Sequence, residues 1–117
     1  MLSPAHRLRT KADFACALRT GRRVPGRLVV LHLALTGADQ PPRAGLAVGR
    51  SVGTSVVRHR VSRRLRHILR AHLRRLPDGS LLVVRALPSA AAASSTELEQ
   101  ALDAGLTTGL ARSAARA

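Results

Sequence analysis

Residues 43–66 hold the densest group of chemically active side chains in this sequence. The segment reads RAGLAVGRSVGTSVVRHRVSRRLR, a short apolar run and a glycine-bearing turn followed by closely spaced arginines. Arginine binds phosphate through two parallel hydrogen bonds and keeps its charge at every physiological pH. We therefore predict a polyphosphate-binding surface made by Arg58, His59, Arg60, Arg63, Arg64 and Arg66. The alternative is a merely solvated helix face, on which so many arginines without acidic partners would destabilise one another.

The charge of the whole chain points to the same kind of partner. Its 117 residues carry 20 lysines and arginines against six aspartates and glutamates, for a formal net charge of +14. Such charge repels itself in a free protein, whereas a nucleic acid neutralises it and releases counterions on binding. The six carboxylates are dispersed along the chain, so no short-range cluster indicates a metal-ion active site. His6, His67 and His72 likewise lack the spacing of a metal site or a catalytic base.

Length and composition limit the class of protein further. A chain of this length forms one domain with a single core, and its 45% apolar content argues against disorder. The one cysteine, Cys16, allows neither an intrachain disulfide nor a zinc site, which fits a reducing compartment. No apolar run approaches the ~18 residues of a membrane span, and the N-terminus lacks the apolar core of a signal peptide. We expect a cytoplasmic protein without membrane contact; an organellar transit peptide is the open alternative.

A helix is predicted over residues 11–19. Thr10 and Asp13 have the spacing of a capping box at its start. Phe14 and Leu18 lie four residues apart on one face, and Gly21 ends the helix.

Two longer strands are predicted at residues 28–35 and 44–48, where apolar and β-branched residues run between glycine and proline. Because the connection is short, we expect the two strands to pair as an antiparallel hairpin. A short extra strand at residues 22–24 is compatible with the pattern.

The stretch after Gly53 predicts an amphipathic helix that separates leucine from arginine. At about 100 degrees per residue the apolar side chains share one stripe, made by Val61, Leu65, Ile68, Leu69, Leu73 and Leu76. The arginines fall outside this stripe, except Arg58, which projects near it in the first turn. Pro77 ends the helix, and residues 81–85 predict a third strong strand, so strand, helix and strand follow one another.

A last helix is predicted to begin near Ser94. The Ser94 side chain can cap this helix while Glu97 reaches back, and its buried face is Leu98, Leu102, Leu106 and Leu110. Residues 89–95 have the composition of an alanine and serine linker, and residues 112–117 are predicted to form a frayed tail of the single domain.

Several motifs, in their order along the chain, resemble the bacterial ribonuclease P protein component. The central match is a strand ending in a basic residue, a glycine, a short bridge and a basic element that opens a helix, here Arg50, Gly53, Arg58, Arg60, Arg63 and Arg66. Arg7-Leu8, Asp13-Phe14 and Gly21 match the family pattern at the right distances. Residues 85–88 follow the third strong strand as in the family, so the similarity spans nearly the whole chain.

The resemblance implies an α+β fold. The family forms a small two-layer α/β sandwich with αβββαβα order, also found in a domain of a ribosomal protein. Its central sheet contains a left-handed βαβ crossover. Sequence alone favours the opposite hand, because about 98% of such crossovers are right-handed.

The resemblance also implies a function, that of the protein subunit of the ribonuclease P ribonucleoprotein. Such a subunit binds the catalytic RNA and the 5′ leader of precursor tRNA, and assists endonucleolytic removal of that leader. Hydrolysis belongs to Mg²⁺ bound mainly by the RNA, with no catalytic side chain and no metal assigned to the protein. The implied partners are the catalytic RNA and precursor tRNA, with no membrane and no obligate protein partner.

The implied contacts with the catalytic RNA are Arg50, Arg58, His59, Arg60, Arg63, Arg64 and Arg66. His59 replaces the usual asparagine of the family, although an imidazole can still donate a hydrogen bond to phosphate. Ser51 and Thr54 stand where basic residues and asparagine are common, so the charge at Ser51 is lost.

The implied leader-binding cleft lies between the first helix and the sheet, with the residues Phe14, Leu18, Val29 and His32. Single strands usually stack on aromatic rings, yet Phe14 is the only aromatic residue of the chain. The other three positions often hold Phe or Tyr in the family, so stacking must be weaker here or rely on His32 and arginine planes. Two alternatives stay open, namely Phe14 as a core residue and His32 as a hydrogen-bonded histidine of the sheet.

Two functions from other classes also stay open. A generic or ribosomal RNA-binding protein explains the charge and the size, but does not require the combined pattern around Asp13-Phe14 and residues 53–66. A self-sufficient nuclease with histidine acid/base chemistry predicts cleavage without any RNA cofactor.

Overall fold

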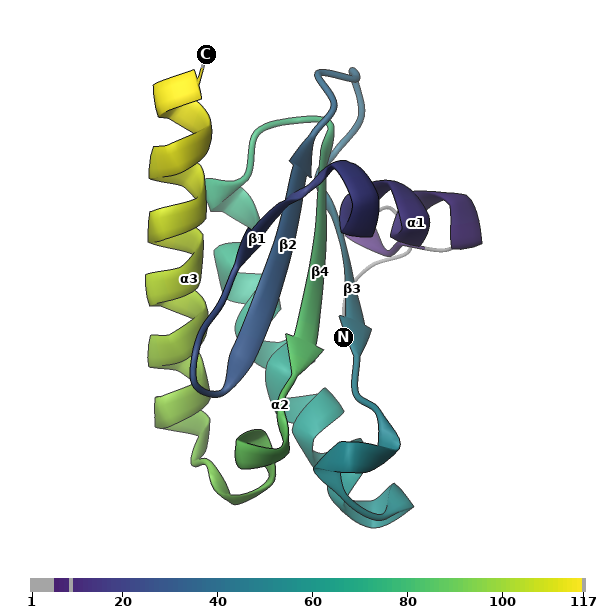
Figure 1. Ribbon diagram of the computed structural model, residues 1–117, viewed down its shortest axis with the longest axis vertical. Helices are drawn as coiled ribbons and strands as arrows, with labels where there is room; N and C mark the ends of the chain where they lie inside the picture. Colours follow the sequence, from purple (N-terminus) through teal and green to yellow (C-terminus); the bar gives the residue numbers. More distant parts are fainter. Residues whose placement is uncertain (1–5, 9, 117) are drawn as a thin grey trace.

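The computed structural model describes the backbone of residues 6–8 and 10–116 and the side chains of these residues up to Arg112. The chain forms α1 (Lys11–Thr20), β1 (Arg22–Val24), β2 (Val29–Leu35), β3 (Arg43–Ala47), α2 (Ser55–His72), β4 (Ser80–Ala86) and α3 (Ser95–Arg116). This order confirms the expected αβββαβα arrangement, including the short strand β1 (Figure 1).

The four strands form one mixed sheet in the order β1-β2-β4-β3. β2 pairs antiparallel with both β1 and β4, whereas β3 pairs parallel with β4. The predicted hairpin between β2 and β3 is therefore wrong: the two run in opposite directions, but β4 lies between them. The physical reason is that Leu81 to Val84 are buried on both faces, which requires a central position. Residues 36–42 need only cross a gap of about 10 Å over the end of β4.

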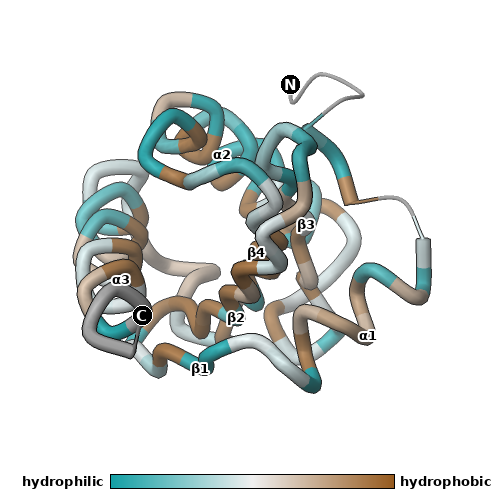
Figure 2. Tube along the Cα trace, turned by 90° about the horizontal axis from the view of Figure 1, so that it is seen from above, coloured by the Kyte–Doolittle hydropathy of each residue, from teal (hydrophilic) through white to brown (hydrophobic). Residues whose placement is uncertain are grey.

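The connection from β3 through α2 to β4 is left-handed. In Figure 1 both strands point downwards, β4 lies to the left of β3, and α2 passes behind the sheet. Figure 2 shows from above that α2 and α1 lie on opposite sides of the sheet. The expected left-handed crossover is thus confirmed, against the general preference for right-handed ones.

The core lies mainly between the sheet and the pair α2 and α3. The six apolar positions of the predicted α2 stripe are all buried there, and so are Leu98, Leu102 and Leu106 of α3. On the other face, α1 covers a smaller cluster of Leu8, Ala17, Ala34, Leu81 and Val83. The molecule therefore has two principal layers, with α1 lying across part of the free face of the sheet (Figure 2).

The two predicted capping residues, Thr10 of α1 and Ser94 of α3, both accept the expected backbone hydrogen bond. Ser94 and Glu97 form the full reciprocal box, with Ser94 N–H donating to Glu97 Oε1 at 2.9 Å and Glu97 N–H donating to Ser94 Oγ at 3.1 Å. Thr10 accepts a bond from Asp13 N–H at 3.0 Å, but the Asp13 carboxylate accepts from Arg43 at 2.7 Å instead of returning to the cap. Asp13 thereby ties α1 to β3.

The segment after β4 differs from its prediction as a linker. Pro88–Ala92 form a 3-10 turn, and Ala90 and Ala93 are buried against the main core. Small side chains let this turn lie close to α2, so the alanines have a packing role. The helix α3 continues through Arg116, and the side chains after Arg112 lie outside the described residues, so fraying of residues 112–117 stays a prediction.

Gly45 of β3 lies directly beneath the ring of Phe14. A Cβ atom added at Gly45 comes 2.5 Å from Phe14 Cζ, whereas one added at Gly49 meets nothing within 4 Å. We expect Gly45→Ala to displace the ring and lower the free energy of unfolding by about 1–3 kcal/mol in urea denaturation. The control Gly49→Ala should change it by less than about 0.5 kcal/mol. Equal stability of the two variants would show that the ring does not pack on β3.

Candidate nucleic-acid interface

The predicted RNA-binding residues gather at the N-terminal half of α2 and the 3-10 turn Arg50–Val52 before it. We call this set the basic block: Arg50, Arg58, His59, Arg60, Arg63, Arg64 and Arg66. Thr54 begins the helix by accepting a hydrogen bond from Val57 N–H. Five members are exposed, while Arg58 and Arg64 are half-buried, so the block presents most of its guanidinium groups to solvent.

Two arginines of the basic block also hold the fold together. Arg60 Nη2 donates to the carbonyl of Ala91 at 3.1 Å, and Arg64 Nη1 donates to the carbonyl of Ala93 at 3.0 Å. Both bonds fasten the turn after β4 to α2. Sequence reasoning treated these side chains as free charges, because nothing in the local pattern indicates an acceptor some thirty residues away.

Arg58 lies near the core, as the helical pattern predicted. Its Nη2 lies 3.4 Å from Ser55 Oγ, and its Nε is buried without a hydrogen-bond partner among the described residues. One edge of this guanidinium thus faces the protein, which leaves Arg50, Arg63 and Arg66 as the more exposed charges.

The ion pairs among the described residues do not involve the basic block. Within the described residues the ion pairs are Arg43–Asp13, His72–Glu99 and Arg75–Asp103, at 2.7, 3.1 and 2.6 Å. Glu97 is engaged at the start of α3, where the Ser94 backbone hydrogen bond holds the pKa of Glu97 below its ordinary value. No ion pair in this part of the chain neutralises a member of the block, so its positive charges reinforce one another.

A hollow of about 290 Å³ lies at the edge of β3, between α1 and α2. Its lining is Arg7, Leu8, Phe14, Ala44, Gly45, Leu46 and Arg66. Phe14 is half-buried, because one side of the ring covers Gly45 while the rest faces this hollow. The structure thus brings Phe14, predicted for the leader, together with Arg66, predicted for the catalytic RNA.

His32 lies in the same transverse row of the sheet as Gly45. The register aligns Arg23, His32, Val83 and Gly45 across the four strands, with Arg85 opposite Val30 in the next row. His32 is 7% exposed, and neither ring nitrogen has a hydrogen-bond partner in the described part of the protein. Among the described residues, the alternative of a hydrogen-bonded sheet histidine is therefore not met. Burial lowers the pKa of His32, and the charges of Arg23 and Arg85 lower that pKa further.

Val29 does not lie with the other predicted leader residues. It is 2% exposed and belongs to the core on the opposite face of the sheet, since neighbouring strand residues alternate between faces. Val30 occupies the α1 face instead. Leu18 is 49% exposed on α1, so Phe14, Leu18 and His32 remain on the predicted side while Val29 is a correction.

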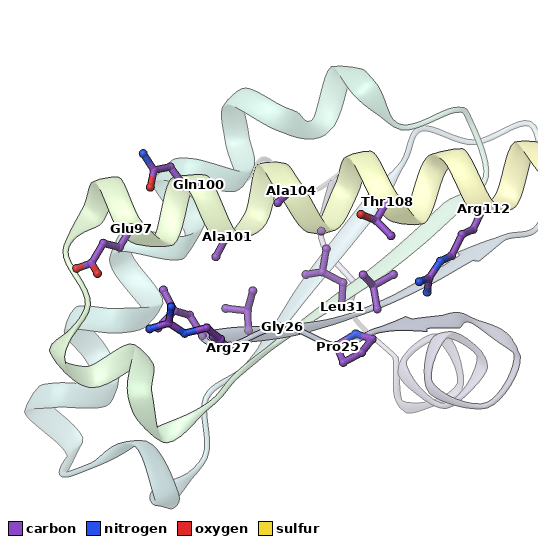
Figure 3. A pocket seen from close by; sticks show the side chains of 14 residues that line it. Pro25, Gly26, Arg27, Leu31, Glu97, Gln100, Ala101, Ala104, Thr108 and Arg112 are labelled. Carbon is purple, nitrogen blue, oxygen red and sulfur yellow. The ribbon is translucent and has the colours of Figure 1, made fainter.

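Val29 instead lines a separate groove of about 460 Å³ between α3 and the turn that joins β1 to β2. Figure 3 shows Leu31 at its middle, Arg27 and Glu97 toward one end and Arg112 toward the other. The groove mixes charges of both signs around an apolar floor, which differs from the uniformly positive basic block.

Among the described residues, no three His, Cys, Asp or Glu side chains come close enough together to hold a metal ion. No helix in the described part of the chain has the length and apolar character needed to cross a membrane.

The chain is similar to known proteins along most of its length. The sequence model of the family described as Ribonuclease P matches residues 2–109. The ribonuclease P protein component of Acidothermus cellulolyticus is 52% identical over 104 residues, covering 88% of this chain and 87% of the relative. That of Streptomyces griseus is 48% identical over 114 residues, covering 91% and 93%.

Solved structures agree in fold. The ribonuclease P protein of Staphylococcus aureus superposes with a TM-score of 0.79 at 22% identity, over 89% of this chain and 94% of that one. The protein of Thermotoga maritima gives 0.74 at 24% identity, over 86% and 94%. On its sequence match and its topology, the chain belongs to the ribonuclease P protein family.

Proposed function

We propose that this protein binds the catalytic RNA of ribonuclease P through its basic block, and the 5′ leader of precursor tRNA through the α1 face of the sheet. Family membership makes the chain a protein subunit of ribonuclease P with a role in tRNA processing, in association with the ribonuclease P RNA. The residues that make each contact, the precursor tRNA and a cytoplasmic location are the parts that we propose.

This proposal rests mainly on one observation: the basic block, whose charges have no carboxylate partner among the described residues, adjoins Phe14 at the hollow beside β3. Arg50, Arg63 and Arg66 are exposed arginines without a carboxylate partner in the described residues, which suits phosphates of a folded RNA. Arg66 also lines the hollow of Phe14, where a base of a single strand can stack. An RNA and the strand leaving it can therefore be held on adjoining surfaces.

In this proposal the protein binds the RNA and the leader and neutralises part of their phosphate charge. Magnesium ions held by the RNA subunit supply the activated water for hydrolysis. The described protein residues do not fit a magnesium site, since no three His, Cys, Asp or Glu side chains among them come close enough together to hold a metal ion. We therefore assign no step of phosphodiester cleavage to a protein side chain.

Cleavage of precursor tRNA tests the proposed function directly. We expect this protein to stimulate cleavage by the cognate catalytic RNA at low magnesium concentration, because its charges replace part of the ionic screening. The protein alone should cut nothing. Tight RNA binding without stimulation would favour a generic RNA-binding protein, and cleavage by the protein alone would favour a nuclease with its own active site.

Arg63 and Arg64 should respond differently to substitution. Arg63→Ala should weaken binding to the catalytic RNA and reduce its salt slope by about one unit per lost phosphate contact, with little change in stability. Arg64→Ala removes the bond to Ala93 and should also lower the free energy of unfolding by about 1 kcal/mol. Arg112→Ala deletes an equal charge on α3 and is the matched control. If it alters the salt slope as much as Arg63→Ala, the basic block is not the specific RNA contact.

Phe14 should determine the preference for precursor over mature tRNA. Phe14→Leu keeps an apolar side chain over Gly45 but removes the stacking ring, and should weaken binding of the precursor by about 1–3 kcal/mol. Mature tRNA should bind with unchanged affinity. Leu35→Ala, at an exposed apolar position of β2 outside the predicted leader-binding residues, serves as a control. Equal weakening of both tRNAs would make Phe14 a structural residue only.

A further inference from the structure

The strand register surrounds His32 with two arginines on the α1 face of the sheet. Arg23 of β1 lies directly opposite His32, and Arg85 of β4 lies opposite Val30, so it is the diagonal neighbour of His32. Val24, Val84 and Ala86 alternate with these arginines and are buried on the other face, which fixes the direction of the two side chains. Diagonal neighbours in a sheet are within reach of long side chains.

His32 is a buried group whose hydrogen-bonding capacity is unused by the described protein. Both ring nitrogens are inaccessible and lack a partner, while Arg23 and Arg85 are exposed. Polar atoms buried in this way are unfavourable unless something else satisfies them. A protonated imidazole offers two donors, so an acceptor that reaches the ring satisfies it.

The other elements of this face add almost no negative charge. β2 carries no ionisable side chain besides His32, and Arg22 of β1 faces the main core side with Val24. α1 contributes Lys11, Cys16, Arg19 and Asp13, and Asp13 is held in the ion pair with Arg43 of β3. The surroundings of His32 are therefore cationic, which disfavours a metal ion and favours an anion.

Resting on the proposed function, we propose that Arg23, His32 and Arg85 form a subsite for one phosphodiester of the single-stranded leader, and that filling this subsite adds a proton to His32. Two guanidinium groups and an imidazolium match the oxygens of a phosphodiester, which accept several charge-assisted hydrogen bonds. Gly45, which lies beneath Phe14, and His32 share one row of the sheet and are two strand spacings of about 5 Å each apart, so one single strand can contact both the ring and the subsite.

The direction of the pH effect follows from the charges. In the free protein, burial and the charges of Arg23 and Arg85 lower the pKa of His32, so its ring is neutral at pH 7. A bound phosphate favours the protonated ring and raises this pKa. Leader affinity therefore increases as the pH falls through the pKa of the complex, and levels off below the pKa of the free protein. Each unit between the two values corresponds to about a tenfold change in affinity.

The test compares precursor and mature tRNA binding to the holoenzyme from about pH 5 to about pH 8, where histidine titrates. The ratio of the two affinities removes contributions common to both tRNAs. We expect this ratio to rise several-fold toward low pH in the unsubstituted protein and to be flat in His32→Gln. His67→Gln, which changes an exposed histidine of α2 outside the basic block, should keep the pH dependence. Calorimetry of a short leader RNA in two buffers of different ionisation enthalpy should detect proton uptake that His32→Gln abolishes.

Further variants keep the proposal testable if His32→Gln fails to fold. Arg23 and Arg85 are exposed, and Arg23→Gln and Arg85→Gln should each lower the affinity ratio at every pH. Unchanged ratios in both, or a pH dependence that persists in folded His32→Gln, would overturn the subsite. A pH-independent preference for precursor tRNA would also overturn it while leaving the proposed function intact. No preference at any pH, together with no stimulation of cleavage, would overturn both.

Discussion

The burial of β4 on both faces is the constraint on which the rest of the structure depends. Its run of leucine and valine is too apolar for an edge, so β4 takes the centre between β2 and β3. Parallel pairing with β3 then requires a crossover, and α2 supplies it on the face away from α1. Because this crossover starts where β3 ends, Arg50 and the first turns of α2 lie beside an edge strand. Arg66 consequently reaches the hollow that Phe14 lines from the other side.

The few carboxylates act at junctions between elements and leave the arginines of the basic block unneutralised. Asp13 ties α1 to β3, while Glu99 and Asp103 tie α3 to the end of α2. Partly exposed pairs of this kind contribute little stability, about 0–1 kcal/mol each, so their main effect is to fix the positions of the helices. The remaining repulsion is relieved only by counterions or by RNA. Folding and RNA binding are therefore linked, since a ligand that binds only the folded, highly charged state stabilises it.

Features that depend on residues close together in the sequence could be predicted, whereas features that depend on distant segments could not. The buried stripe of α2 and the cap formed by Ser94 and Glu97 depend on residues within one or two helical turns, and both are as predicted. Strand order depends on pairing between distant segments, so a short connection wrongly favoured a hairpin. Neighbouring residues of a strand face opposite sides of the sheet, and only the observed register shows that Val29 faces the core while Val30 faces α1. The anchoring of Arg64 at Ala93 requires the fold itself.

The scarcity of aromatic rings changes what such a surface can recognise. In the proposed complex a single ring, Phe14, can stack on a base, and the other contacts on the α1 face come from Arg23, Arg85 and Arg66. Phosphate contacts position a strand but carry no sequence information. Discrimination between leader sequences is then confined to the base at Phe14, while affinity depends on charge. In this proposal the subunit binds leaders of many sequences. Its affinity for them falls steeply as ionic strength rises, because every contact with phosphate is made in competition with salt.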